Sequence, residues 1–119
     1  MRILAVDDSP TIRSVIAATL RSATHEVVEA ENGRDALQVL ERETVDLIIS
    51  DLNMIVMDGF EFVSKVRENP AFEFTPILFL TTEAAEDMKQ LGRELGATGW
   101  LLKPFDPVEL INVVRRICH

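Results

Sequence analysis

The chain has 119 residues, of which 47% are apolar, and it carries a formal net charge of −8 from 20 acidic and 12 basic side chains. This length supports one hydrophobic core but not two domains, and the high apolar content argues against a disordered chain. The acidic balance argues against direct binding to nucleic acid, because a phosphate backbone requires a basic surface.

Five short apolar runs alternate with longer amphipathic stretches along the chain. The runs predict strands at residues 3–6, 26–30, 47–50, 77–80 and 100–102. The first, third and fourth runs are almost wholly apolar, which is typical of strands that are covered on both faces of a parallel sheet. The second run carries Glu26 and Glu29, so we expect it at an edge of the sheet.

Helix start signals precede four of the amphipathic stretches. A capping side chain followed by proline occurs at Ser9-Pro10 and at Asp106-Pro107, and each pair predicts a helix N-terminus. The pairs Asn32-Gly33 and Asp58-Gly59 predict turns before the second and third helices. The fourth helical stretch, around residues 88–95, has the thinnest apolar stripe, so we expect it to be the least firmly held helix.

Strands that alternate with helices predict right-handed crossovers and an α/β fold with a doubly wound, five-stranded parallel sheet. No linker, repeat or low-complexity tract interrupts the pattern. We therefore expect residues 1–119 to form one (βα)5 domain, with no output domain.

Cysteine usage and the apolar segments bear on location. The single cysteine, Cys118, excludes an internal disulfide and fits a reducing compartment. Asp7 and Asp8 cut the first apolar run too short for a signal peptide, and no segment approaches the roughly 18 apolar residues of a membrane span. We expect a cytoplasmic protein that does not bind membranes.

Polar residues follow four of the five apolar runs, at Asp7-Asp8, Asp51, Thr81-Thr82 and Lys103-Pro104. Open parallel sheets bind ligands at the carboxyl ends of their strands, so we expect these residues to meet in one shallow cleft. Each of them alone is more often a cap or a turn residue. Their positions at equivalent ends of four strands indicate a shared site.

Three carboxylates this close repel one another, and one lysine does not neutralise them, so we expect either a raised carboxylate pKa or a bound cation. Oxygen ligands suit Mg²⁺, whereas neither cysteine nor histidine lies at a strand end to bind zinc. A Mg²⁺ ion and Lys103 together would stabilise an incoming phosphoryl group, and Asp51 is the expected nucleophile.

The sequence resembles the response-regulator receiver family over essentially all of its length, and in particular the single-domain chemotaxis (CheY-like) type. The motifs that carry the resemblance are Val6-Asp7-Asp8-Ser9, Asp51-Leu52-Asn53-Met54, Met57-Asp58-Gly59, Leu80-Thr81 and Gly99-Trp100-Leu101-Leu102-Lys103-Pro104-Phe105. The closer likeness rests on Thr81-Thr82-Glu83, Gly96-Ala97-Thr98-Gly99-Trp100 and Lys103-Pro104-Phe105-Asp106-Pro107. The resemblance implies a flavodoxin-like receiver fold with strand order 2-1-3-4-5.

The resemblance also implies roles for the site residues. Asp51 would accept phosphate from a histidine kinase. Mg²⁺ would be bound by Asp8, Asp51 and the backbone carbonyl of Asn53, with Asp7 acting largely through water. Lys103 would hold a phosphoryl oxygen.

Further roles concern switching and the lifetime of the phosphate. A cis bond between Lys103 and Pro104 would help to place the lysine. Thr81 would swing toward the phosphate, and the aromatic side chain at position 100 would follow it inward. The residues expected to tune the phosphate lifetime are Asn53, Thr82 and Glu83.

The output implied by the resemblance is a change in protein–protein binding rather than an enzymatic product. It would act through the face made by the fourth helix, the fifth strand and the fifth helix, on a downstream protein such as the flagellar motor switch. A phosphate sink or shuttle in another phosphorelay stays open as an alternative. We expect a monomer.

Three residues depart from the family pattern. Ile55 replaces a common proline, which predicts a less rigid loop after Asp51. Thr82 replaces a common alanine, and its bulk is expected to restrict access to Asp51. Trp100 replaces the usual Tyr or Phe, and its larger indole predicts a graded or sliding movement rather than full inward rotation. The alternative interpretation of Trp100 is a strand residue packed against the fourth helix.

Two other functions fit less well. An aspartyl-phosphate phosphatase would need a second aspartate two residues after the nucleophile, where Asn53 stands. A flavodoxin-like nucleotide-binding module would need a phosphate-binding loop after the first strand, where Asp7 and Asp8 would repel a phosphate that lacks a metal.

Overall fold

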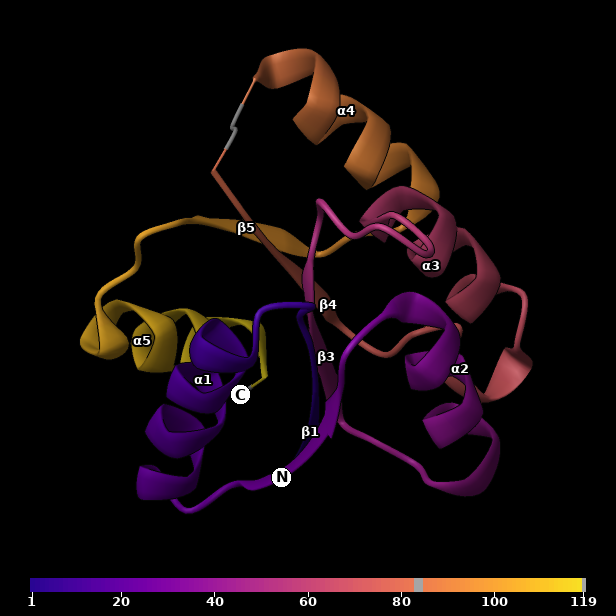
Figure 1. Ribbon diagram of the computed structural model, residues 1–119. Coiled ribbons are helices and arrows are strands. Elements are labelled where there is room, and N and C mark those ends of the chain that lie inside the picture. The colour runs from indigo at the N-terminus through magenta and orange to yellow at the C-terminus, as the bar shows by residue number, and fades with distance from the viewer. Residues whose placement is uncertain (83–84, 119) are drawn as a thin grey trace.

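The computed structural model describes residues 1–82 and 85–118, and in these residues five parallel strands form one sheet in the order β2-β1-β3-β4-β5 (Figure 1). The strands are β1 (Arg2–Val6), β2 (Glu26–Ala30), β3 (Leu47–Asp51), β4 (Ile77–Thr81) and β5 (Gly99–Leu102). The helices are α1 (Pro10–Ser22), α2 (Gly33–Arg42), α3 (Gly59–Arg67), α4 (Glu86–Leu95), α5 (Pro107–Ile117) and a short 3-10 helix, η1 (Pro70–Phe72). The predicted fold, strand order and edge position of β2 are confirmed.

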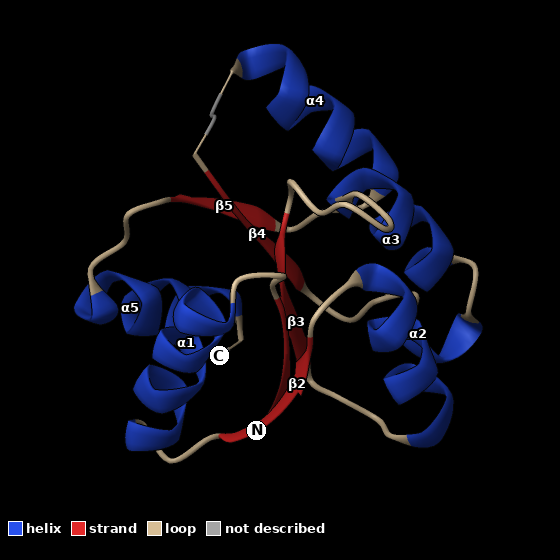
Figure 2. Cartoon of the chain, viewed as in Figure 1, coloured by secondary structure: helices blue, strands red, loops and turns tan. Residues whose placement is uncertain are grey.

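Helices cover both faces of the sheet. α1 and α5 lie on one face, and α2, α3 and α4 lie on the other (Figure 2). Alternate residues of the central strand β3 serve the two cores, because Leu47 and Ile49 pack with α1 and α5 while Ile48 packs with α2 and α3. None of the helices in the described ranges has the length and apolar character that a bilayer crossing requires.

The ends of the strands matter most for the site. Each predicted run is confirmed as a strand, but β3 extends one residue further to Asp51 and β4 one residue further to Thr81. β1 and β5 each begin one residue earlier than predicted, at Arg2 and Gly99. The polar residues are therefore the last residues of their strands or follow them within two residues.

The predicted start signals form N-caps. The side chains of Ser9 and Asp106 accept hydrogen bonds from backbone N–H groups in the first turns of α1 and α5. Asn32 and Asp58, which the sequence indicated only as turn residues, cap α2 and α3 in the same way.

Helix α4 is attached differently at its two ends. Ala85 precedes it and supplies no side-chain cap, and Gly92 is the buried residue of this helix. At the other end Gly96 has a φ of 108°, which favours glycine, and its carbonyl oxygen accepts a 2.7 Å hydrogen bond from Arg67. The same guanidinium donates to the carbonyl oxygens of Phe72 and Thr75. The C-terminal end of α4 is thus tied to α3 and to the start of β4.

Candidate functional site

Three carboxylates converge at the carboxyl ends of β1 and β3, as the sequence predicted. Asp7 and Asp8 follow β1, and Asp51 is the last residue of β3, the strand that pairs with β1. One oxygen from each of the three lies within 4.8 Å of the others. Asp7 is fully buried and Asp51 is 5% exposed, whereas Asp8 is exposed.

Lys103 brings one positive charge into this cluster from the loop after β5. Its Nζ atom lies 3.0 Å from Oδ2 of Asp7 and 3.1 Å from Oδ1 of Asp51. Its backbone N–H donates to the carbonyl oxygen of Thr81 at 2.8 Å, which joins the loop to the end of β4. The peptide bond between Lys103 and Pro104 is cis.

The charges in this cluster do not balance. Burial raises the pKa of Asp51, and the nearby Asp7 raises it further, although Lys103 opposes both effects. Burial lowers the pKa of Lys103, but its bonds to Asp7 and Asp51 outweigh burial, so its pKa lies above the ordinary value. Lys103 is therefore charged, while the carboxylate of Asp51 is only partly compensated by the protein. A cation would complete the compensation.

The donor atoms suit a hard divalent cation. Oδ1 of Asp7 accepts from the backbone N–H of Ser9 at 2.9 Å, and its Oδ2 accepts from Lys103, so both oxygens of Asp7 already have protein partners. The exposed Asp8 and the nearby Asp51 are the other two carboxylates of the cluster. Carboxylate oxygens with room for several waters match the coordination that Mg²⁺ prefers.

Three of the other predicted site residues, Thr81, Thr82 and Asn53, follow or end strands beside this cluster. Thr81 is fully buried at the end of β4, beside the strand that carries Asp51. Thr82 and Asn53 are exposed, and the backbone N–H of Asn53 donates to Oδ1 of Asp51 at 3.4 Å. Glu83 lies outside the described residues. Ile55, in the loop after β3, is 93% exposed.

Trp100 lies in β5 and packs against α4, as the alternative interpretation predicted. Its ring centroid is 5.2 Å from that of Phe79 and 6.4 Å from that of Phe60. A Cβ atom added to Gly92 of α4 would come within 2.6 Å of the indole atom Cζ2. In the described part of the chain, the buried Nε1 of Trp100 has no hydrogen-bond partner.

Known proteins share this arrangement of strands and helices. The sequence family described as "Response regulator receiver domain" matches residues 3–115. The chain belongs to this family. Receiver domains act as phospho-accepting switches of two-component systems rather than as classical enzymes, and this general function applies to the chain.

Relatives of this receiver domain include chemotaxis proteins. A chemotaxis protein CheY homolog of Campylobacter jejuni is 39% identical over 109 residues, which are 90% of this chain and 84% of that protein. The structure of the chemotaxis protein CheY4 of Vibrio cholerae is 50% identical and superimposes with a TM-score of 0.96, over 98% of this chain and 97% of that one.

A third relative bears on the metal. The receiver domain of the sensor histidine kinase PA1611 of Pseudomonas aeruginosa is 31% identical, with a TM-score of 0.90 over 98% of this chain and 96% of that one. Its structure is described as having a magnesium ion coordinated in the active-site cleft. The acidic cluster of Asp7, Asp8 and Asp51 offers the carboxylate oxygens that such an ion takes as ligands.

The sequence did not indicate every side chain that supports the site. Arg13 of α1 donates from Nη1 to the carbonyl oxygen of Asp7 at 2.7 Å. Gly92 leaves space for the indole of Trp100. From the sequence alone, a glycine inside a helix indicates only a weak helix former. The first contact ends on a backbone carbonyl oxygen and the second depends on how closely two elements pack, so no local periodicity reveals them.

Proposed function

We propose that this receiver domain accepts a phosphoryl group on Asp51 in a Mg²⁺-dependent step, with a histidine kinase as the donor. The observation that carries the proposal is the position of Asp51. It is a buried carboxylate, within 4.8 Å of two other acidic groups and 3.1 Å from the ammonium group of Lys103. A nucleophile, a cation-binding cluster and a positive charge thus lie together, as phosphoryl transfer requires.

The proposed chemistry is a displacement at phosphorus. A carboxylate oxygen of Asp51 forms the new P–O bond while the P–N bond to the donor histidine breaks, and the departing imidazole takes up a proton. Asp8, Asp51 and the backbone carbonyl of Asn53 would bind the Mg²⁺ ion directly, with Asp7 acting through water. When bound, Mg²⁺ neutralises negative charge on the phosphoryl oxygens.

Lys103 and Thr81 would complete the site. Lys103 already lies between Asp7 and Asp51, so its ammonium group can move onto a phosphoryl oxygen without a change of strand or helix. The buried position of Thr81 beside β3 supports a role for its hydroxyl group as a second contact to the phosphoryl group. Neither residue needs to act as an acid or a base.

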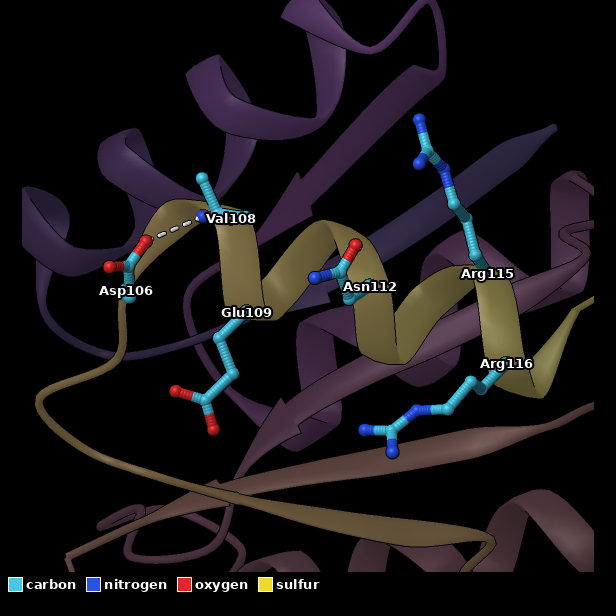
Figure 3. A pocket seen from close by; sticks show the side chains of 6 residues that line it. All are labelled: Asp106, Val108, Glu109, Asn112, Arg115 and Arg116. Atoms are coloured by element: carbon cyan, nitrogen blue, oxygen red, sulfur yellow. Dashed lines mark hydrogen bonds between the residues drawn. The ribbon is translucent and has the colours of Figure 1, made fainter.

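The proposed output is altered protein binding on the face of α4, β5 and α5. Each element carries an exposed apolar side chain, at Leu91, Leu102 and Val108. Beside them is an open pocket along α5, where Glu109 and Arg116 extend in the direction of β5 (Figure 3). The pocket is lined by Asp106, Val108, Glu109, Asn112, Arg115 and Arg116. This mixture of apolar and charged groups suits a reversible protein contact.

Chemotaxis is the proposed pathway, because CheY proteins of Campylobacter jejuni and Vibrio cholerae are among the relatives. The flagellar motor switch is then the proposed partner. Phosphorylation adds roughly two negative charges to the acidic cluster. The response would reach the partner through Trp100 and α4, since Trp100 packs directly beneath Gly92 of that helix.

The test is incubation with a small acyl phosphate, followed by the intact mass of the protein. We expect one added phosphate in the presence of Mg²⁺ and none in excess chelator. Asp51→Asn should abolish the addition, whereas Asp87→Asn, which removes an exposed carboxylate of α4, should leave it unchanged. Phosphate that is still incorporated by Asp51→Asn would overturn the assignment of the acceptor.

A further inference from the structure

Arg13 of α1 links the edge of the sheet to the acidic cluster. Its Nη1 donates to the carbonyl oxygen of Asp7 at 2.7 Å, and its Nε lies 3.3 Å from Oε1 of Glu29 on β2. The Arg13 side chain is only 18% exposed, so it is enclosed between these two partners rather than extended into solvent. A guanidinium presents its N–H groups in a fixed plane, so Glu29 on one edge orients the donor that reaches Asp7.

The contact with Asp7 is made through the peptide group that joins Asp7 to Asp8. Since a peptide group is planar, a fixed carbonyl oxygen also fixes the direction in which the backbone enters Asp8. Asp7 is already held at its N–H by Ala30 and at its carboxylate by Ser9 and Lys103. The Arg13 bond immobilises the remaining polar atom of Asp7, the one nearest to Asp8.

Asp8 is the carboxylate that most needs such support. It is exposed, whereas Asp7 and Asp51 are buried and fixed by their surroundings. An exposed ligand that is free to reorient would lose conformational entropy when it binds a cation. A preset backbone direction reduces that loss.

We propose that Arg13, oriented by Glu29, is a positioning residue that holds the backbone of Asp8 in the direction needed for Mg²⁺ binding. This proposal rests on the function proposed above. The electrostatic effect of Arg13 has the opposite sign, because a positive charge close to the cluster repels a divalent cation. Removal of the side chain therefore distinguishes the two effects. Loss of positioning weakens Mg²⁺ binding, and loss of charge alone strengthens it.

Arg21 provides a matched control. Like Arg13, it lies on α1 and contacts the carboxylate of Glu29, with Nη2 at 3.4 Å from Oε2. Its other hydrogen bond goes to the carbonyl oxygen of Val27, not to the site. Arg21→Met removes the same charge from the same helix and the same partner without a contact to Asp7.

The experiment is a calorimetric titration of Mg²⁺ into the metal-free protein. Arg13→Met is expected to weaken the affinity by about tenfold, the lower end of the range for groups that orient metal ligands, and Arg21→Met to change it by less than about twofold. Glu29→Gln should also weaken the Mg²⁺ affinity, but by less. The double variant with Arg13→Met and Glu29→Gln should bind Mg²⁺ no more weakly than Arg13→Met alone. Such non-additive losses of affinity are expected if Glu29 acts through Arg13, and independent losses of fold stability would not produce them.

Three results would overturn the inference. The Arg13→Met affinity could equal or exceed that of the wild type, Arg21→Met could weaken binding as much as Arg13→Met, or the losses from Arg13→Met and Glu29→Gln could simply add. A wild-type protein that does not bind Mg²⁺ would overturn the proposed function together with this inference. Wild-type binding that Arg13→Met does not change would overturn the positioning role alone.

Discussion

Lys103→Met is expected to slow phosphate incorporation by about 10²–10³-fold, the usual cost of removing one preorganised donor to a charged transition state. The same substitution should strengthen Mg²⁺ binding, because it removes the positive charge that lies 3.0 Å from Asp7 and 3.1 Å from Asp51. The rate is measured by intact mass over time with a small acyl phosphate, and the affinity by calorimetry.

The opposite directions of these two effects make the prediction specific. Lys65→Met, which removes an exposed lysine of α3, should change neither quantity. A Lys103→Met protein that accepts phosphate at the wild-type rate would show that Lys103 only compensates the resting carboxylates.

Gly92→Ala is expected to destabilise the protein by about 1–3 kcal/mol, the typical cost of overpacking a filled site. At a solvent-exposed position inside a helix, the same change would stabilise the protein by about 1 kcal/mol, because alanine is the better helix former. Here the new Cβ would lie 2.6 Å from Cζ2 of Trp100. The indole cannot easily withdraw, since Phe79 and Phe60 pack against it. Urea unfolding gives the free energy.

A second substitution at position 100 checks the cause. Trp100→Phe removes the atom that clashes, so Gly92→Ala introduced into Trp100→Phe should be neutral or stabilising. If Gly92→Ala stabilises the protein while Trp100 is present, α4 does not pack closely against the indole at Gly92.

The sequence was sufficient to predict the fold and to name polar residues that the structure brings together, because both follow from local signals. Apolar runs locate buried strands. The polar residues at the ends of these strands meet because parallel strands end at one edge of the sheet; they are Asp7, Asp51, Thr81 and Lys103. The chemistry of the donors then restricts the choice of metal. The shift of a strand end by one residue does not alter this logic.

Contacts between side chains and backbone carbonyl groups could not be predicted. Arg67 donates to the carbonyl oxygen of Gly96, which is 29 residues away, and Arg13 donates to that of Asp7. Every residue has a carbonyl group, so such an acceptor leaves no mark in the sequence. The fit of Gly92 to Trp100 depends likewise on how closely α4 approaches β5.

The central claim is that the excess negative charge of the cluster is compensated by a divalent cation on which phosphoryl transfer depends. Protons compete with that cation, since the raised pKa of Asp51 means that its carboxylate takes up a proton at a higher pH than an ordinary aspartate. Mg²⁺ affinity should therefore fall as the pH is lowered toward that pKa. It should stay constant well above it.

The most direct measurement is a calorimetric titration of Mg²⁺ into the wild type and into Asp8→Ala, whose exposed position makes loss of the fold unexpected. We expect one Mg²⁺ per wild-type chain and at least about tenfold weaker binding to Asp8→Ala. Equal Mg²⁺ affinities in the two proteins, or no binding to the wild type at neutral pH, would contradict it.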